Sequence, residues 1–364
     1  MAENISNYQH IIVILQLINR IKMGLAKTEM FTDKQNEISL FAKVFGHPAR
    51  VAILEHLFKI NCCVFGDLVN EIGLVQPSIS QHLKELKQVG LIKGNIDTNE
   101  ASRAVGMAID NGINLFDTAY DYLFSEEWIG WALHSRYDEF YLATKCGCND
   151  TQPTSNNSDH EWTRDNLFRN MEISLRRLNR DSVDIIQLHN ATAAECEAGG
   201  LVQALSDIRD QGMVRWIGAS TTLPDLPTLL SWGVFDVMQI PYSALQREHE
   251  DWIAKAAQDG VGIIIRGGVA QGEHGLGTAS SDTWKTFDRA SLGELLEEGE
   301  SRSAFVLRYT LSHPNADTVI VGTTRTDHLQ ENIDAVMRGP LLADVYTEAK
   351  RRLDAAGESP APVD

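Results

Sequence analysis

Six polar residues each end or directly follow a short apolar run, and they are Asp117, Lys145, His189, Ser220, Gln239 and Arg266. Continuous runs of Val, Ile, Leu and Phe are typical of strands that are covered on both faces. If such strands close into a parallel barrel, their carboxyl ends meet on one face, which is where active sites of this architecture are built. The spacing therefore predicts that the six polar groups share one cleft.

Tyr122 follows Asp117 by five residues and offers a phenol as a general acid. Carbonyl reduction needs a hydride from a nicotinamide and a proton for the developing alkoxide. A free phenol titrates near pH ~10, and an adjacent ammonium such as that of Lys145 stabilises the phenolate and lowers this pKa. Asp117 would hold and orient the lysine. The residue types thus indicate hydride-transfer chemistry with Tyr122 as proton donor.

Seven predicted strands must position these residues, and they lie at 113–117, 140–145, 184–189, 214–219, 236–240, 261–266 and 318–322. They alternate with stretches of helical period, which is the pattern of repeated βα units. In one such stretch, 166–179, Leu167, Met171 and Leu175 recur at a spacing of four. We predict an α/β fold, a (β/α)₈ TIM barrel, whose eighth strand comes from before residue 100 or is missing.

The segments NLFDTAYDY, YLATK and IIQLH resemble the three motifs that hold the catalytic tetrad of the aldo-keto reductases. The likeness covers residues from about 100 to 340. It implies that Asp117, Tyr122, Lys145 and His189 form the tetrad, with Tyr122 donating the proton and His189 orienting the carbonyl. The implied activity is the NADP-dependent reduction of an aldehyde or ketone to an alcohol.

The same resemblance implies a cofactor site. Ser220 and Gln239 would bind the nicotinamide amide, Tyr242 would stack on its ring, and GTTRTDHLQEN (322–332) would hold the 2′-phosphate and adenine. The full predicted set is Ser220, Gln239, Tyr242, Arg266, Gly267, Gly322, Thr324, Arg325, His328 and Asn332. Because a guanidinium binds phosphate oxygens in pairs, NADPH (NADP⁺) is expected rather than NADH.

Two stretches depart from the family pattern. His328 stands where Gln is usual, and IIIRGGVAQGE (263–273) replaces the commoner aromatic-Ser-Pro-Leu version. The sequence therefore specifies the cofactor contacts less closely than the tetrad. The Cys146-Gly147-Cys148 segment follows the strand of Lys145 and is interpreted as part of a loop, so no metal is expected.

The N-terminal segments FGHPARVAILEHL and GDLVNEIGLVQPSISQHLKELKQVGLIKG (66–94) resemble the ArsR family of winged-helix repressors, over about residues 23–96. The likeness implies a small α-rich winged helix-turn-helix whose recognition helix lies in the major groove of DNA. It places Gln76, Ser78, Ser80, Gln81 and Lys84 against bases or phosphates. The alternative is that these polar residues only cap a helix.

Both likenesses stop near residues 94–100, which is typical of a fusion. We predict a helical extension at 1–22, a winged helix-turn-helix with a truncated wing at 23–96, and a barrel lacking its own first strand at 97–364. Leu91–Gly94 then either fills the slot of the first barrel strand or is strained between wing and barrel.

Charge is unevenly distributed along the 364 residues, whose net charge is −18. Residues 1–97 hold 10 Lys and Arg against 9 Asp and Glu, and the remainder hold 22 against 41. An acidic surface repels nucleic acid, so DNA contact is expected only from the first segment, chiefly 66–94.

Cysteine usage and hydropathy bear on location. The five cysteines lack paired C-x-x-C spacing, which favours a reducing, cytoplasmic setting over a disulfide or zinc framework. The apolar run IIVILQLI is too short to span a bilayer. It is interpreted as an amphipathic helix that packs or dimerises, so an oligomer formed through the N-terminal helices is a candidate.

Three functions remain open from the sequence. The first is a reductase acting on a small carbonyl substrate. The alternative is a DNA-binding transcription regulator in which the barrel is a sensor domain. The third is a fusion whose barrel does not close and has no activity, because an unpaired barrel edge exposes backbone donors and acceptors.

Overall fold

The structure is a computed structural model that describes residues 12–13, 32, 45–60, 78, 81–83, 85–86, 92–93, 98–122, 125–149, 160–270, 272, 281–323 and 326–363. The described residues up to Lys93 belong to one compact unit and those from Thr98 onward to a second. None of the helices in these residues has the length and hydropathy needed to cross a membrane.

A two-stranded antiparallel sheet lies in the N-terminal unit. Strand β1 (Ile12–Val13) pairs with β2 (Ile92–Lys93), with Ile12 opposite Lys93. The larger sheet of the chain does not include β2. For the described residues Ile92 and Lys93, this pairing disagrees with the alternative in which Leu91–Gly94 fills the first-strand slot of the barrel. Strand-forming residues favour a strand, but the choice of partner depends on contacts outside that strand.

Helix α2 (Pro48–Ile60) and a helical segment at residues 78, 81–83 and 85–86 form the rest of the described N-terminal unit. Ile53 and Leu86 are fully buried. Arg50 forms an ion pair with Glu85, which joins α2 to that segment. Burial lowers the pKa of His82, whose ring lies 4.2 Å from the ring of His47. The described positions of this unit are thus helical where the resemblance to a winged helix-turn-helix implies helices.

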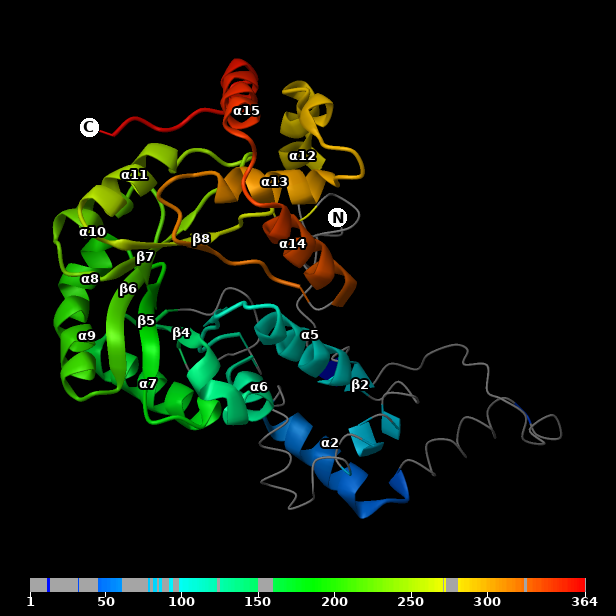
Figure 1. Ribbon diagram of the computed structural model, residues 1–364. Helices are drawn as coiled ribbons and strands as arrows, with labels where there is room; N and C mark the ends of the chain where they lie inside the picture. Colours follow the sequence, from blue (N-terminus) through cyan, green and yellow to red (C-terminus); the bar gives the residue numbers. More distant parts are fainter. Residues whose placement is uncertain are drawn as a thin grey trace. The chain divides into compact units, whose positions relative to one another are not determined.

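Seven parallel strands form a curled sheet in the larger unit (Figure 1). They follow one another in chain order as β3 (Leu115–Asp117), β4 (Tyr141–Cys146), β5 (Val183–His189), β6 (Val214–Ser220), β7 (Val237–Pro241), β8 (Gly262–Arg266) and β9 (Thr318–Val319). All seven predicted strands are present, and the predicted α/β fold with a parallel sheet is confirmed.

Helices connect the strands and cover the outside of the curl (Figure 1). They are α5 (Thr98–Asp110), α6 (Ser125–Ala132), α7 (Arg164–Leu178), α8 (Ala193–Gly199), α9 (Leu201–Asp210), α10 (Leu226–Ser231), α11 (Glu250–Gln258), α12 (Ser281–Arg289), α13 (Arg302–Leu311), α14 (Thr326–Arg338) and α15 (Ala343–Ala355), with short 3₁₀ helices η2 (His134–Glu139) and η3 (Leu292–Leu295).

Helix α7 shows how the sequence specifies these elements. Thr163 caps its first turn by accepting a hydrogen bond from the Asn166 amide, and the chain leaves the helix at Asn179 with a φ of 52°. Leu167 and Met171 are fully buried on its inner face. Each such side chain contributes about 2 kcal/mol when removed from water. The helix predicted at 166–179 is confirmed.

The strands bury two apolar layers. Cys146 and Ile186 belong to the large core between sheet and helices. Ala143, Ile185 and Ile264 belong to a separate cluster with contributions from every strand, which places them inside the curl. Side chains two positions apart along a strand lie on the same face. Lys145 and Gln187, two positions after Ala143 and Ile185, therefore face the interior too.

Strands β3 and β9 stand at the two ends of the ladder, and no described strand pairs with both of them. The helical layer nevertheless closes at this point. Ala104 and Ala108 of α5 pack against Leu329 and Ile333 of α14 in one buried cluster. Within the described residues, the helices therefore form a continuous layer across the gap where an eighth strand would pair.

Candidate active site

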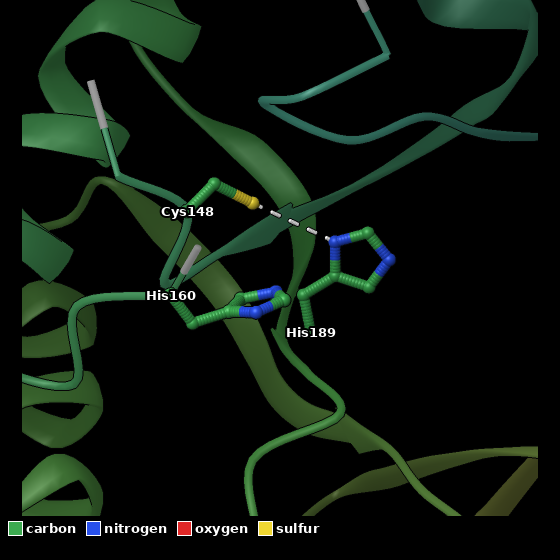
Figure 2. A group of neighbouring side chains, drawn as sticks. All are labelled: Cys148, His160 and His189. Atoms are coloured by element: carbon green, nitrogen blue, oxygen red, sulfur yellow. Dashed lines mark hydrogen bonds between the residues drawn. The ribbon is translucent and has the colours of Figure 1, made fainter. Parts of the chain in front are cut away.

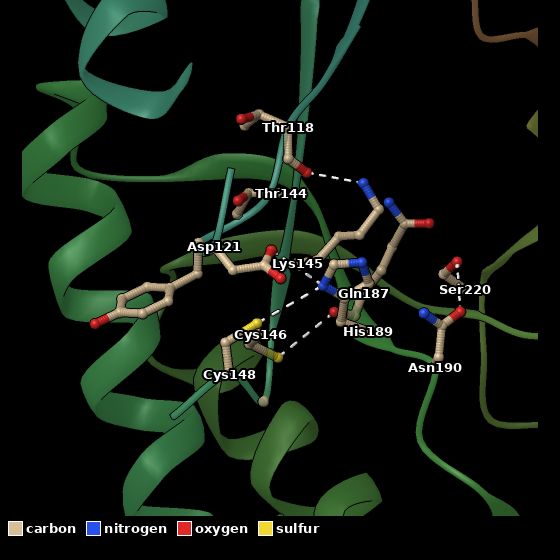
Figure 3. A network of polar contacts seen from close by, with 12 residues as sticks. Thr118, Asp121, Thr144, Lys145, Cys146, Cys148, Gln187, His189, Asn190 and Ser220 are labelled. Atoms are coloured by element: carbon tan, nitrogen blue, oxygen red, sulfur yellow. Dashed lines mark hydrogen bonds and ion pairs between the residues drawn. The ribbon is translucent and has the colours of Figure 1, made fainter. Parts of the chain in front are cut away.

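Asp117 and Lys145 form a buried ion pair at the carboxyl ends of β3 and β4. The Lys145 ammonium contacts Asp117 Oδ2 and donates to the Thr118 carbonyl oxygen over 2.9 Å, as Figure 3 shows for Thr118. The exposed fractions of the two side chains are 1% for Lys145 and 6% for Asp117. A buried charge pair persists only when its partners satisfy it, and here both do. The ammonium is therefore fixed at one point of the interior.

Two amides complete the surroundings of Asp117. Gln187 Nε2 and Gln239 Nε2 each donate to Asp117 Oδ1 over 3.0 Å. The sequence did not single out Gln187, although it precedes His189 by two residues on β5 and so faces the same side. The alternation of side chains along the strand could have identified Gln187 as a residue of this site. The Gln187 Oε1 atom is buried without a hydrogen-bond partner among the described residues.

Tyr122 lies in the turn after β3 and is 43% exposed. The Lys145 Nζ atom is 4.9 Å from the centre of its ring. The His189 ring is 5.7 Å from the Tyr122 ring, in an edge-to-face arrangement. A phenol that is open to solvent on one side and close to an ammonium on the other is placed to exchange a proton with a bound molecule.

His189 ends β5 and presents its Nδ1 atom to two neighbours. Asp121 Oδ1 lies 3.3 Å from Nδ1, and Cys148 Sγ lies 3.6 Å from it (Figure 3). The sequence did not predict either contact. Asp121 could have been suspected because it adjoins Tyr122, whereas Cys148 was interpreted only as a loop residue. With Nδ1 engaged, the ring position is set and Nε2 is the atom left for a substrate.

Arg266 ends β8, and three strands of the curled sheet, β5 to β7, lie between β8 and β4. Burial lowers the pKa of its guanidinium, while the charges of Tyr122 and Asp117 act to raise it. Its Nε atom is buried and has no hydrogen-bond partner in the part of the chain that the structure describes. The next residue, Gly267, has a φ of +73°, and a Cβ there would meet no atom closer than 3.9 Å. A buried donor beside open backbone is suited to an anionic ligand.

Ser220 and Tyr242 differ in placement. Ser220 ends β6 in the interior and donates to Asn190 Oδ1 over 3.5 Å (Figure 3). Tyr242 is fully buried among core residues on the helical side, and burial raises its pKa well above the ordinary value. Tyr242 directly follows β7 and is three positions after Gln239, and an odd spacing along an extended chain puts two side chains on opposite faces. The structure does not bring Tyr242 to Asp117.

The remaining predicted cofactor residues lie around the start of α14. Gly322 is exposed just before this helix, and His328 and Asn332 lie partly exposed within it. Thr324 and Arg325 are outside the described residues. Of the predicted DNA-binding residues, Ser78 and Gln81 are helical, and Gln81 donates to Glu85 over 3.2 Å. Gln76, Ser80 and Lys84 lie outside the described residues.

Comparison with known proteins gives two family matches. Residues 83–353 match the model described as "Aldo/keto reductase family", and residues 47–93 match "Bacterial regulatory protein, arsR family". The first match begins earlier than the boundary near 98 expected from the motifs, and the two overlap at 83–93. Both resemblances predicted from the sequence are confirmed.

Individual relatives align with the larger unit. The uncharacterized oxidoreductase YqkF of Bacillus subtilis (strain 168) is 27% identical over 270 residues, covering 69% of this chain and 87% of that protein. The L-galactose dehydrogenase of Arabidopsis thaliana is 25% identical over 266 residues, covering 68% and 81%.

Solved structures give the same picture. The holo form of aldo-keto reductase AKR11C1 from Bacillus halodurans has a TM-score of 0.62 at 26% identity, covering 71% of this chain and 88% of that one. The glycerol dehydrogenase AKR11B4 from Gluconobacter oxydans has a TM-score of 0.62 at 21% identity, covering 74% and 89%, which shows the fold alone. The predicted barrel fold class is confirmed, with seven of its strands among the described residues.

Proposed function

Because the chain belongs to the aldo/keto reductase family, we propose that it reduces an aldehyde or ketone to an alcohol with NADPH as the cofactor. The observation that carries this proposal is the convergence of Asp117, Tyr122, Lys145 and His189 at the ends of three neighbouring strands. Of these four, Tyr122 is the most exposed, so it is the group that a substrate reaches first.

Tyr122 is the proton donor in this proposal. NADPH, when bound, supplies the hydride to the carbonyl carbon. The carbonyl oxygen then gains negative charge and takes the phenolic proton from Tyr122. The Lys145 ammonium lies 4.9 Å from the centre of the ring of the phenolate left behind, and its charge favours the ionised form. Asp117 and the Thr118 carbonyl keep that ammonium in place throughout.

His189 orients the substrate. Its ring stands edge-to-face to Tyr122, so a carbonyl oxygen that contacts the phenol also comes within reach of His189 Nε2. The contacts of Nδ1 with Asp121 and Cys148 hold the ring against rotation. A fixed ring keeps the reacting oxygen close to the proton donor, and such positioning accounts for a large part of catalysis.

The cofactor side fits an anionic dinucleotide. The unpartnered Arg266 Nε and the open backbone at Gly267 would take a charged part of NADPH. Ser220 and Gln239, both interior, would contact the nicotinamide amide. The start of α14, with Gly322, Thr324, Arg325, His328 and Asn332, would bind the 2′-phosphate end, since helix N-termini favour anions.

Replacing Tyr122 by Phe tests the proposal. We expect turnover of a panel of small aldehydes and ketones to fall by about 10²-fold or more, because the general acid is lost. The affinity for NADPH, followed by quenching of protein fluorescence, should stay within about twofold, which is under ~0.5 kcal/mol.

The matched control is Tyr141→Phe. Tyr141 is 45% exposed, close to the 43% of Tyr122, and it lies at the opposite end of β4 from Lys145. Its hydroxyl should not affect turnover. Undiminished turnover in the Tyr122 variant, or a wild-type protein that reduces carbonyls without binding NADPH, would contradict the proposal.

DNA binding is a second candidate function, favoured by the arsR-family match at residues 47–93. We propose that Gln76, Ser78, Ser80, Gln81 and Lys84 contact DNA. The near-neutral charge of residues 1–97 permits such contact, whereas the acidic remainder of the chain opposes it. Gel shifts with promoter DNA and excess competitor at two salt concentrations decide the point, since specific binding survives the competitor.

A further inference from the structure

Cys148 and His160 face each other across an isolated antiparallel bridge directly after β4. The Glu161 amide donates to the Gly147 carbonyl over 2.9 Å and extends this pairing. Gly147 has a φ of +107°, and a Cβ at this position would lie 1.8 Å from the Trp162 ring. The close approach of Trp162 thus requires the glycine. Backbone pairing, rather than flexible side chains, holds the cysteine and the histidine opposite each other.

His189 completes a group of three. Figure 2 shows Cys148 Sγ directed at His189 Nδ1, 3.6 Å away, with the His160 ring beside both. The ligand atoms of the three residues all lie within 4.8 Å of one another. The His160 ring stacks flat on Trp162 with 4.9 Å between ring centres, and it stands edge-to-face to His189 at 5.8 Å.

We propose that Cys148, His160 and His189 bind one zinc-class divalent cation and that this binding inhibits the reductase. One thiolate and two imidazoles are a donor set that Zn²⁺ prefers over Mg²⁺ or Ca²⁺. As the S–Zn bond forms, the Cys148 thiol releases its proton to solvent. Asp121 Oδ1, 3.3 Å from His189 Nδ1, or a water molecule would occupy the fourth position.

The bound metal would inhibit carbonyl reduction through its effect on His189. With bonds of about 2.3 Å to sulfur and about 2.1 Å to nitrogen, tetrahedral ligand atoms lie about 3.5 Å apart, so the group must contract. Cys148 Sγ and His189 Nδ1 are already 3.6 Å apart, so His160 moves toward them, and the metal bound at Nδ1 replaces the Asp121 contact that sets the position of the His189 ring. A displacement of about 1 Å in a positioning group can cost about 10²-fold in rate.

Cobalt binding tests the site without any activity measurement. Co²⁺ bound by a thiolate gives a charge-transfer absorption band, and Zn²⁺ should displace it at one metal per chain. The full chain carries Cys62→Ser and Cys63→Ser, so that these thiols do not contribute. We expect Cys148→Ser to abolish the band and His160→Ala to weaken Co²⁺ affinity at least tenfold.

Cys146→Ser is the matched control. Cys146 lies two residues before Cys148, but its thiol belongs to the outer core and donates to the Gln187 carbonyl. Burial also raises its pKa far above the ordinary value, so it is a poor metal ligand. This variant should keep the cobalt band. A wild-type chain without the band, or a band that survives Cys148→Ser, would overturn the site.

A second arm tests inhibition and rests on the proposed reductase activity. Zn²⁺ should lower the turnover of the wild type, and His160→Ala should keep its basal turnover while losing most of the inhibition. His160 is exposed and has no part in the proposed carbonyl reduction. Equal inhibition of both proteins refutes the inhibitory role. The cobalt arm decides the site even if no carbonyl is reduced, so the two proposals fail separately.

Discussion

The two sides of the interior site differ in how completely the protein pairs its own charged groups. On the side of β3 and β4, the Asp117 carboxylate accepts from Lys145, Gln187 and Gln239, and the Lys145 ammonium has two oxygen partners. On the side of β8, the Arg266 side chain is half-buried, and its buried Nε atom has no hydrogen-bond partner among the described residues. The protein itself supplies partners for the charged groups of the Lys145 side, whereas Arg266 Nε has none within the residues that the structure describes.

The difference separates two tasks. A catalytic ammonium has to be in position before the substrate arrives, because reorganisation during the reaction raises the barrier. A binding cation gains most when its desolvation is offset by the ligand itself. Under the proposed function, we therefore expect the Lys145 side to contribute to folding stability as well as catalysis, and the Arg266 side to lower stability in exchange for cofactor binding. Substitutions on the two sides should separate these effects.

The largest effect is expected from Lys145→Met. Removing the cation leaves the buried Asp117 carboxylate without its charged partner, which should lower the free energy of unfolding by about 3–5 kcal/mol. Turnover should fall by about 10²-fold or more, because the phenolate of Tyr122 loses its stabilising charge. Thermal unfolding and steady-state kinetics measure the two losses.

A second substitution separates the loss of stability from the loss of turnover. Adding Asp117→Asn to Lys145→Met removes the unpaired charge, so stability should recover in large part while turnover stays low. Lys255→Met is the surface control, because Lys255 and its partner Asp259 are 41% and 38% exposed. Such exposed pairs contribute about 0–1 kcal/mol. If Lys145→Met is no less stable than this control, the preorganised side does not exist.

The intermediate effect is expected from Arg266→Met, which keeps an apolar stem and removes the charge. The affinity for NADPH should fall about tenfold, or about 1.4 kcal/mol. The melting temperature of the protein without cofactor should stay the same or rise, because burial of this cation opposes folding. Fluorescence titration and thermal unfolding give the two numbers.

Arg215→Met is the control for that experiment. Arg215 is exposed near the amino end of β6 and stacks on Trp216 with 4.0 Å to the ring. It should leave NADPH affinity unchanged. A clear loss of stability in Arg266→Met without loss of affinity would reverse the comparison, since Arg266 would then be a structural cation like Lys145.

The strands and the interior residues could be predicted because each depends on a local pattern. In the run 184–189, Ile185, Ile186 and Leu188 put apolar side chains on both faces of the strand, since both faces are buried, and strand ends in a parallel sheet meet on one face. Those two rules bring Asp117, Lys145 and His189 together without knowledge of any long-range contact. Gln187 follows from the alternation alone and could have been included.

Contacts made by loops could not be predicted in this way. Cys148 and His160 meet across an antiparallel bridge, and nothing in the sequence around either residue specifies that bridge. Tyr242 was placed by resemblance, and its odd spacing from Gln239 turned it to the other face. The partner of Ile92–Lys93 was also beyond local rules, because a two-residue strand does not determine which edge it joins.

The smallest of the three effects concerns acid stability, and it sharpens the comparison because it belongs to the Arg266 side. His249 is buried, and its Nε2 atom accepts a hydrogen bond from the Leu223 amide over 3.0 Å. Burial lowers the pKa of His249, with Glu248 acting to raise it and Arg266 acting to lower it further. The neutral ring is therefore the form that fits the folded protein.

Proton linkage gives the direction in which stability changes with pH. An unfolded histidine titrates near pH ~6.5, so the stability contributed by neutral His249 is present above that pH and is lost as the pH falls toward the lowered folded pKa. His249→Gln keeps an acceptor for the Leu223 amide but does not titrate. The decline in melting temperature between pH 7 and pH 5 should become shallower, by about 2 °C for a loss of about 1 kcal/mol.

His134→Gln is the control for the pH experiment, because His134 is exposed and its hydrogen bond within the described residues is with the Trp131 carbonyl, at 3.2 Å. It should leave the acid decline unchanged. His313 is also buried with a lowered pKa, so the His249 variant should retain part of the decline. If the Arg266→Met protein shows a shallower decline as well, the guanidinium and the imidazole are coupled. The loss of stability in acid would then depend on the Arg266 side of the site.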